Sequence, residues 1–449
     1  MLGFVKARTA MSWSGLLSAS VLGLGLGLVM GAPSLVQAQL VTPELIDRAD
    51  APITLTIQPR FGYSHQSNDE KRRLVLTEAL ESWAARHPDV KIEVLVQQGD
   101  DAVIVAKRLQ DAAAGRAADA IMVETLDYRK FYSLAKSFDP YLSAADKADF
   151  LPGVLQGMTD PDSGAVKYLQ ITSYTTGLWY RSDLVETPPA SLEELATMAA
   201  KLKADHGFRY GVFLPGGTGV MNYTLLPQVV SIGGQILADD ADATPVFNEP
   251  ANREALIKVL TWHKEMVDGG LIPADVISFT STGDTVSRVE AGEMPFAFGG
   301  TFIGGGIKGS SQAEKWAFAP MPQLGGATPV PYQGGWSWAM FTDDVQKQAL
   351  ITDLLMDTYT GPWAMAKWGE AGGYTPTRLS SLAKYTGFTN PGLDNAFAAA
   401  VQTARLTPNG RLRDVVDAAI TNAYAQVISG ALSPAEAVDA AWATVELEM

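Results

Sequence analysis

The sequence contains no cysteine. Disulfide bonds and thiolate metal sites are therefore excluded, and no cysteine is available for lipid attachment behind an export signal. Histidine is almost as scarce, because only His65, His87, His206 and His263 occur. None of them pairs at the spacing of a zinc motif such as H-E-x-x-H. We therefore expect no metal site and no cofactor, and we expect His263 to be packed rather than reactive.

Positive charge is also scarce, since 34 lysines and arginines face 49 acidic residues and give a net charge of −15. Such a chain repels polyanions, so we exclude nucleic acid as a partner. Charged residues make up only 18% of the sequence and hydrophobic residues 47%. This composition is typical of a globular protein with a large core, and the length favours more than one lobe.

Long apolar runs are confined to the beginning of the chain. Lys6 and Arg8 precede an apolar run from Leu16 to Met30, and small residues follow it up to Ala38. This order is typical of a secretory signal, so we predict that residues 1–38 form a signal peptide cleaved after Ala38. A retained membrane anchor is the alternative, because about 18 apolar residues can span a bilayer. Glycines within the run favour cleavage.

Export without a lipid anchor favours the periplasm of a two-membrane bacterium, where a soluble protein stays confined. On a surface with no outer membrane, the same protein would diffuse away. We therefore predict a soluble periplasmic protein that is not a lipoprotein.

The chain that follows the signal begins with alternating strands and helices. Ile53, Leu55 and Ile57 alternate as on a strand, and further strands are predicted at 90–96 and 120–123. The first intervening helix is predicted to begin at a capping box of Ser67 and Glu70. The second is predicted to cover about 103–114. Parallel sheets bind ligands at the carboxyl ends of their strands, which here are the segments 60–63 and 124–128.

A second α/β unit follows Tyr168. A capping box of Ser191 and Glu194 opens one helix, another is predicted from Pro250 to Val267, and the tail is helical from Val415 with a new start at Ser433-Pro434. These elements predict two α/β lobes.

Several motifs in order carry a specific resemblance. The segment 87–94 reads HPDVKIEV, 177–184 reads GLWYRSDL and 188–195 reads PPASLEEL. Further landmarks are Gly292-Glu293-Met294, Ala319-Pro320-Met321-Pro322, Gly334-Gly335 and Pro376-Thr377-Arg378. This ordered set resembles the family 1 extracellular solute-binding proteins, the receptors of ABC importers typified by maltose-binding protein. Arg181-Ser182 departs from the usual Asn-Lys and limits transfer of the ligand's identity.

The resemblance implies the α/β periplasmic-binding-protein fold, with two lobes, a three-segment hinge and the ligand in the cleft between the lobes. We expect an N-terminal lobe of residues 51–170 plus 338–373 and a C-terminal lobe of 175–334 plus 376–449. The crossing segments are expected near Ile171 to Thr175, Gly334 to Trp338 and Gly372 to Thr375. Gly334 and Gly335 would then act as a flexible part of the hinge at the cleft floor.

A sugar needs aromatic rings for its C–H face and polar groups for its hydroxyls. Trp336 and Trp338 lie two apart and share one face of an extended segment. The resemblance adds aromatic and amide positions, and the strand ends add carboxylates and an arginine. The predicted ligand-binding residues are Arg60, Tyr63, Glu124, Asp127, Tyr174, Asn222, Tyr223, Phe302, Trp336, Trp338, Tyr374 and Arg378.

Each of these residues has an alternative structural interpretation. The aromatic residues can instead belong to the core, Asp127 can cap the next helix, and Arg378 can pair with a surface carboxylate. The segment GWSWA at 335–339 has the outline of a nucleophile elbow but ends in alanine, and no strand-to-helix turn is predicted there. We expect no catalytic residues.

The sequence therefore predicts the substrate-binding subunit of an ABC importer, a monomer that carries a di- or oligosaccharide, glucoside or polyol to the membrane permease. The alternatives are an exported carbohydrate hydrolase, because 49 acids offer many carboxylate pairs, and a binding protein for a quaternary ammonium solute. A glycerol-phosphate ligand is disfavoured by the acidic balance and by the lack of clustered cations in the predicted loops.

Overall fold

The computed structural model describes residues 46–96, 101–217, 219–240 and 242–449. The predicted signal peptide and its cleavage site lie outside the described residues. The chain from Thr42 to Met449 forms one compact unit. Within the described part, none of the helices has both the length and the apolarity needed to cross a membrane.

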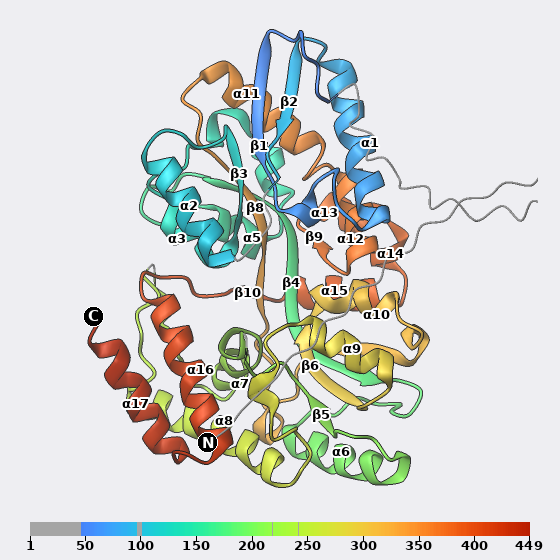
Figure 1. The fold of residues 1–449 in the computed structure, drawn as a ribbon, viewed down its shortest axis with the longest axis vertical. Helices are drawn as coiled ribbons and strands as arrows, with labels where there is room; N and C mark the ends of the chain where they lie inside the picture. The colour runs from blue at the N-terminus through green and yellow to red at the C-terminus, as the bar shows by residue number, and fades with distance from the viewer. Residues whose placement is uncertain (1–45, 97–100, 218, 241) are drawn as a thin grey trace, which may run out of the picture. The chain divides into compact units, whose positions relative to one another are not determined.

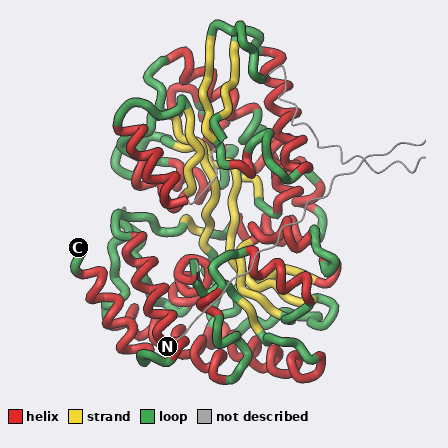
Figure 2. Tube along the Cα trace, in the orientation of Figure 1, coloured by secondary structure: helices red, strands yellow, loops and turns green. Residues whose placement is uncertain are grey.

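The described strands form one ten-stranded sheet with the order β2-β1-β3-β8-β4-β6-β5, to whose inner strands β7, β9 and β10 add (Figure 1; Figure 2). β1 pairs in parallel with both β2 and β3, as the predicted β-α-β-α-β order requires. The elements of this order are β1 (Ile53–Gln58), α1 (Glu70–Arg86), β2 (Val90–Val94), α2 (Asp101–Ala113) and β3 (Ala120–Glu124).

The start of α1 differs from the prediction. Asp69 is the N-cap, and its side chain accepts a hydrogen bond from the Arg72 backbone N–H at 3.1 Å. Ser67 instead accepts from the Asp69 backbone N–H at 3.2 Å. The predicted capping box of Ser67 and Glu70 is therefore wrong, because a carboxylate two residues later takes the capping position.

Other helix starts and stops are confirmed. Ser191 caps α6 (Leu192–His206), but Glu194 accepts from the Ala190 backbone N–H at 2.9 Å, so the predicted capping box there is only half formed. Ser433 and Glu436 form a complete capping box before α17 (Pro434–Glu446). α8 (Pro250–Asp268) and α16 (Arg413–Ser429) also occupy the predicted regions.

Two long strands, β4 (Tyr168–Arg181) and β8 (Tyr332–Met340), run antiparallel through the middle of the sheet. The remaining elements are α3 (Tyr128–Phe131), α4 (Ala144–Ala148), α5 (Pro152–Met158), β5 (Val212–Phe213), α7 (Leu226–Ser231), α9 (Gly283–Ala291), β6 (Phe296–Gly300), α10 (Gly304–Lys308), β7 (Trp316–Ala319), α11 (Val345–Asp357), α12 (Pro362–Gly372), β9 (Thr375–Pro376), α13 (Leu379–Lys384), α14 (Thr386–Thr389), α15 (Leu393–Gln402) and β10 (Arg405–Leu406).

Buried apolar side chains form separate cores. We call lobe 1 the elements around the cluster that contains Trp83, Trp338 and Trp368. Lobe 2 comprises the elements around the two clusters that contain Leu178 and Trp179. β4 and β8 contribute to the cores of both lobes, since they pass from one to the other (Figure 1).

The third passage between the lobes comes later than the predicted crossing at Gly372 to Thr375. Leu382 of α13 and Phe388 of α14 pack into the core of lobe 1, although the prediction assigned 376–449 to the C-terminal lobe. The chain returns to the core of lobe 2 with α16 and stays there through α17. The other lobe boundaries stay predictions.

Candidate ligand-binding site

One group of aromatic rings gathers between the end of β1 and the middle of β8, on either side of β3 in the sheet order. Tyr63, just after β1, stacks on Trp368 with ring centroids 4.2 Å apart. Its ring centroid lies 6.1 Å from that of Trp336 and 6.2 Å from that of Tyr374. The Tyr63 hydroxyl forms a 3.0 Å hydrogen bond with Thr172 Oγ1 of β4, which fixes the ring against the strand that crosses between the lobes.

Guanidinium groups cover these rings. The Arg60 guanidinium lies 4.5 Å from the Trp336 ring centroid, and that of Arg72 lies 4.7 Å from the ring of Trp368 and 6.0 Å from the ring of Tyr374. Cations favour the faces of aromatic rings. The faces of Trp336, Trp368 and Tyr374 therefore already carry a cation.

A second group of rings lies toward lobe 2. The ring centroid of Tyr174 in β4 is 5.2 Å from that of Phe302 and 6.2 Å from that of Tyr223, and Tyr223 and Phe302 are themselves 5.2 Å apart. Tyr223 comes from the π-helical turn Met221–Leu225, and Phe302 follows β6. Three residues far apart in the sequence thus form one aromatic wall, and their contact with a ligand stays a prediction.

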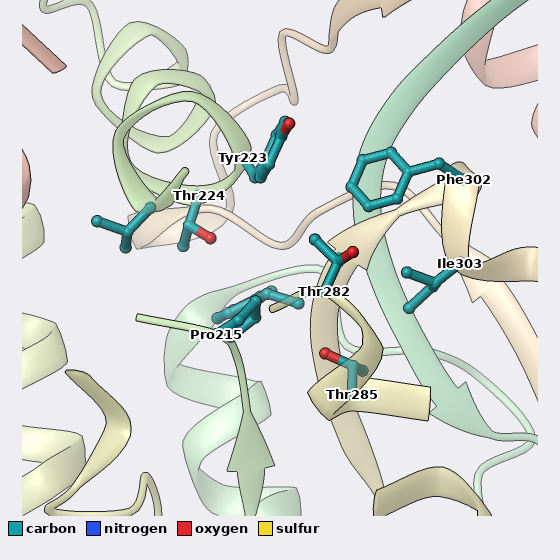
Figure 3. A pocket seen from close by; sticks show the side chains of 10 residues that line it. Pro215, Tyr223, Thr224, Thr282, Thr285, Phe302 and Ile303 are labelled. Atoms are coloured by element: carbon teal, nitrogen blue, oxygen red, sulfur yellow. The ribbon is translucent and has the colours of Figure 1, made fainter. Parts of the chain in front are cut away.

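Beside this second group is a cavity of about 10 Å³, which has room for about one water molecule. Figure 3 shows the rings of Tyr223 and Phe302 along one side of it and Thr285 on the opposite side. The larger open space is a groove of about 870 Å³ lined by α2 and α3 of lobe 1 and by α16 of lobe 2. Both lobes line this groove, and the second group of rings reaches it through Gly219, which lines the groove and packs closely against the Tyr223 ring.

Glu124 connects the two aromatic groups. It ends β3, directly opposite Trp336 in the β3–β8 ladder, and its Oε1 accepts a hydrogen bond of 3.2 Å from the Tyr174 hydroxyl. Burial raises the pKa of the Tyr174 hydroxyl, and Tyr223 and the Glu124 carboxylate raise it further. Tyr174 therefore stays a neutral hydrogen-bond donor at physiological pH.

Gly334 and Gly335 allow close approach rather than flexibility. Both lie in the regular strand β8, and neither has a positive φ. A Cβ on Gly335 would lie 1.8 Å from the Thr172 carbonyl oxygen, and one on Gly334 would lie 2.4 Å from the Tyr174 hydroxyl. The expected flexible hinge is therefore corrected, since these glycines make room for β4 and for a site tyrosine.

The two tryptophans of β8 differ in exposure. Trp338 is completely buried, and its ring contacts Tyr359 at a centroid distance of 4.9 Å, so it belongs to the core of lobe 1. Trp336 is half-buried at the site beside Arg60. Of the pair, only Trp336 keeps part of its ring exposed.

Of the remaining predicted residues, two lie near the groove or the aromatic groups and one lies apart from them. Asp127 lies at the groove, paired with Lys130 at 2.7 Å, and its side chain does not cap α3. Asn222 is buried next to Tyr223, and its Oδ1 has no hydrogen-bond partner among the described residues. Arg378 lies apart from the aromatic groups, because its Nε donates to Asp149 at 2.6 Å and its guanidinium stands over Phe150. The alternative structural interpretation therefore fits Arg378.

Sequence reasoning missed three residues at the site. Arg72 and Trp368 lie on the buried sides of helices, and the sequence pattern does not distinguish them from other helix residues that face a core. Arg413 opens α16 far along the chain, and no motif marks it. The one available signal was the position of Arg72 in the first turn of the helix that follows the end of the first strand.

A metal centre and a reactive histidine find no support in the part of the chain that the structure describes. No group of three or more histidine, aspartate and glutamate side chains there could hold a metal ion. His263 is completely buried, as expected, with its Nε2 3.0 Å from Gln228 Oε1, and burial lowers its pKa to about 3.

Residues 78–395 match the sequence profile of a family described as bacterial extracellular solute-binding protein. A protein of Brucella abortus (strain 2308) described as a binding protein is 26% identical over 350 residues, which cover 74% of this chain and 79% of that protein. An ABC transporter periplasmic-binding protein of Escherichia coli (strain K12), YcjN, is 19% identical over 213 residues, covering 45% of this chain and 48% of that protein.

Solved structures share the fold. Maltose-bound MalE3 of T. maritima superposes with a TM-score of 0.74 at 17% identity, covering 88% of this chain and all of that chain. The GacH receptor of Streptomyces glaucescens superposes with a TM-score of 0.71 at 20% identity, covering 88% and 97%. The periplasmic-binding-protein fold predicted from the motifs is thereby confirmed.

Proposed function

Because the chain belongs to the bacterial extracellular solute-binding protein family, we propose that it captures a carbohydrate in the periplasm and delivers it to the permease of an ABC importer. The proposed ligands are di- or oligosaccharides, glucosides and related polyols. In this proposal the protein is a monomer that binds its ligand without altering it, and residues 1–38 direct its export.

One observation carries the choice of ligand: aromatic rings from both lobes gather around a carboxylate. Tyr63 contacts Trp336 and Tyr374, and Trp336 is opposite Glu124 in the β3–β8 ladder, whereas Tyr174 donates to Glu124 and contacts Tyr223. Rings match the C–H face of a pyranose, and a carboxylate accepts charge-assisted hydrogen bonds from hydroxyls, which contribute roughly 1.5–3 kcal/mol each.

The charges at the site disfavour a quaternary ammonium ligand. Such a ligand needs open ring faces, whereas Arg60 and Arg72 already lie over Trp336, Trp368 and Tyr374. A second cation there would meet like charge. A neutral ligand with hydroxyl groups avoids this repulsion.

We propose that binding works by a population shift. A ligand that touches both lobes favours the closed arrangement, and the closed form docks on the permease. An affinity in the micromolar range, about −8 kcal/mol, needs only two stacked rings and a few good polar contacts after association costs are met.

A thermal-shift screen tests the ligand class. The probes are maltose, maltotriose, mannotriose, trehalose, sorbitol, glycine betaine and glycerol 3-phosphate. We expect a neutral sugar or polyol to raise the unfolding midpoint, because a ligand of the folded state stabilises it by mass action. A shift caused by glycine betaine alone would contradict the carbohydrate proposal.

The same probes separate binding from hydrolysis. The protein is incubated with each oligosaccharide that gives a shift, and the sugar is recovered and analysed by chromatography. We expect stoichiometric, unaltered sugar. Release of shorter products would instead support the alternative of an exported hydrolase, which needs two suitably spaced carboxylates.

A further inference from the structure

Arg413 is an unusual residue of this structure because its charge is buried. Among the described residues, only Arg108 and Arg413 are arginines with less than a tenth of their surface exposed. The guanidinium of Arg108 is held by the carbonyl oxygens of Met122 and Gln58 and by the Gln58 side chain. Burying a charge is costly unless it is paired and hydrogen-bonded, and Arg108 meets that condition.

Arg413 meets it only in part. Its Nη1 donates to Asp414 Oδ1 at 3.0 Å, and its Nη2 lies 3.9 Å from Asp417 Oδ2, beyond hydrogen-bond distance. Its Nε has no hydrogen-bond partner among the described residues. Asp414 is also shared with Lys130 of lobe 1 at 2.7 Å. The lobe-2 partners alone therefore leave the Arg413 guanidinium under-satisfied.

The loop before α16 holds Arg413 at the ligand site. Asn409 Nδ2 donates to the backbone oxygen of Thr125, the neighbour of Glu124, at 2.8 Å. Thr407 Oγ1 donates to the backbone oxygen of Gln333, just before the two glycines of β8, at 3.0 Å. The first turn of α16 is thus tied to the strand ends that carry Glu124 and Trp336.

The electrostatics agree with this placement. Burial raises the pKa of Tyr223 and so does Glu124, whereas the guanidinium of Arg413 lowers it, and Arg413 acts on Tyr174 in the same direction. Burial acts to lower the pKa of Arg413, but Asp417, Asp414, Glu124 and Asp127 together raise it. The guanidinium therefore lies within electrostatic range of Glu124, Tyr174 and Tyr223.

We propose that Arg413 is a ligand-contacting residue that selects neutral ligands carrying neighbouring hydroxyl groups. Its guanidinium donates a hydrogen bond to a hydroxyl oxygen, and Glu124 of lobe 1 accepts a hydrogen bond from the same or the adjacent hydroxyl. A hydroxyl can do both, because it is a donor and an acceptor. This inference rests on the proposed function and gives one residue of that site its role.

The same arrangement disfavours acidic sugars. A carboxylate ligand would gain from Arg413 but would face Glu124 and Asp127, which both act on the Arg413 guanidinium. Like charges in one site raise each other's free energy. Because Arg413 and Glu124 belong to different lobes, a hydroxyl held by both also favours closure.

The test is a titration of wild type and variants by calorimetry with the neutral sugar or polyol that gives the largest thermal shift. We expect Arg413→Met to raise Kd about 10- to 100-fold, the range for losing a charged hydrogen bond. The matched control is Arg411→Met, two residues earlier, which is exposed and donates to the Glu448 carbonyl oxygen. It should leave Kd within about twofold.

A double-mutant cycle tests the shared hydroxyl. If Arg413 and Glu124 hold one ligand group, the effects of Arg413→Met and Glu124→Gln on binding are non-additive. Additive effects would overturn the shared contact. The uronic-acid counterpart of the probe sugar should bind wild type more weakly than the sugar itself, and tighter binding would overturn the selectivity for neutral ligands.

The unfolding midpoint of ligand-free protein keeps the inference separate from a structural role. We expect Arg413→Met to lower this midpoint only slightly, since Asp414 keeps Lys130 as a partner and the partly buried Asp417, whose pKa burial already raises, can take up a proton. A large drop in midpoint with unchanged Kd would make Arg413 a structural ion-pair partner and overturn the inference alone. If wild type binds none of the probes, the proposed function fails, and this inference fails with it.

Discussion

At the scale of the residue, the tryptophans of β8 show how one strand serves two purposes. Trp338 fills the core of lobe 1 completely, whereas Trp336 stands half-buried at the site under Arg60. The sequence predicted that the two rings share a side of the strand but could not rank their exposure. Exposure depends on what packs above each ring, and those residues come from distant segments such as Tyr359 and Arg60.

Replacing each of the two tryptophans by alanine should affect a different property, ligand binding in one case and stability in the other. Trp336→Ala should raise the Kd for the bound sugar about tenfold or more, because a stacking surface is lost, with little change in stability. Trp338→Ala should lower the free energy of unfolding by about 3–5 kcal/mol through the cavity it leaves. Calorimetry and urea unfolding measure the two effects. Trp363→Ala, on an exposed residue of α12, is the control and should change neither quantity.

His263 makes stability depend on pH. Burial lowers its pKa to about 3, whereas the unfolded chain has the ordinary value of 6.5, so between these values the unfolded state binds the extra proton. The contribution of neutral His263 to the free energy of unfolding is therefore fully present above pH 6.5. It falls as the pH decreases toward 3, by up to about 1.4 kcal/mol per pH unit. Urea unfolding at pH 7 to 4 should show a shallower decline for His263→Gln.

The control for this measurement is His206→Gln, since His206 is exposed at the end of α6. It should reproduce the wild-type pH dependence. An unchanged slope in His263→Gln would mean that other groups, such as the buried His65, whose pKa burial also lowers, dominate the acid response.

At the scale of the element, local signals in the sequence predicted the helices and strands well. Alternating Ile53, Leu55 and Ile57 predicted β1, and Ser433 with Glu436 predicted the start of α17. The start of α1 was wrong because two residues competed for one capping role, and Asp69 took it. The third passage between the lobes was wrong because tertiary packing of Leu382 and Phe388, which no local pattern announces, keeps those helices with lobe 1.

The pairing of β4 with β8 predicts a strict requirement for Gly335. A methyl group there would lie 1.8 Å from the Thr172 carbonyl oxygen, which is backbone and cannot turn away. Gly335→Ala should therefore lower the free energy of unfolding by about 1–3 kcal/mol or more and weaken sugar binding as well. Urea unfolding measures the first effect and calorimetry the second.

Gly62→Ala is the matched control for this substitution, because a Cβ at Gly62 would meet nothing within 4 Å. Its stability should stay within about 1 kcal/mol of wild type. If Gly335→Ala were equally harmless, the close approach of the two strands would not be the reason for the glycine.

At the scale of the whole molecule, two consecutive cations of α3 join the lobes. Arg129 binds Asp162 of its own lobe at 2.9 Å and Asp242 of lobe 2 at 2.8 Å. Lys130 in the same way binds Asp127 of its own lobe and Asp414 of lobe 2, each at 2.7 Å. These pairs hold the two sides of the groove together in the arrangement described here.

Binding should therefore weaken with salt. Raising NaCl from about 20 to 500 mM screens partly exposed ion pairs, so Kd for a neutral sugar should rise about two- to fivefold. In Arg129→Met/Lys130→Met this salt dependence should disappear while the low-salt Kd rises by a similar factor. Arg253→Met removes a pair with Asp439 inside lobe 2 and should keep the wild-type salt dependence. Equal salt dependence in all three proteins would contradict the role of the α3 cations.

The register of β4 against β8 shifts between Gln170 and Thr172, just where both strands leave the core of lobe 1. Such a bulge increases the right-handed coiling of a strand pair. Increasing the twist of this strand pair and decreasing it are then not equivalent in energy, so a rotation of one lobe against the other has a preferred direction. The hand of the twist, and with it that direction, follows from the chirality of the amino acids.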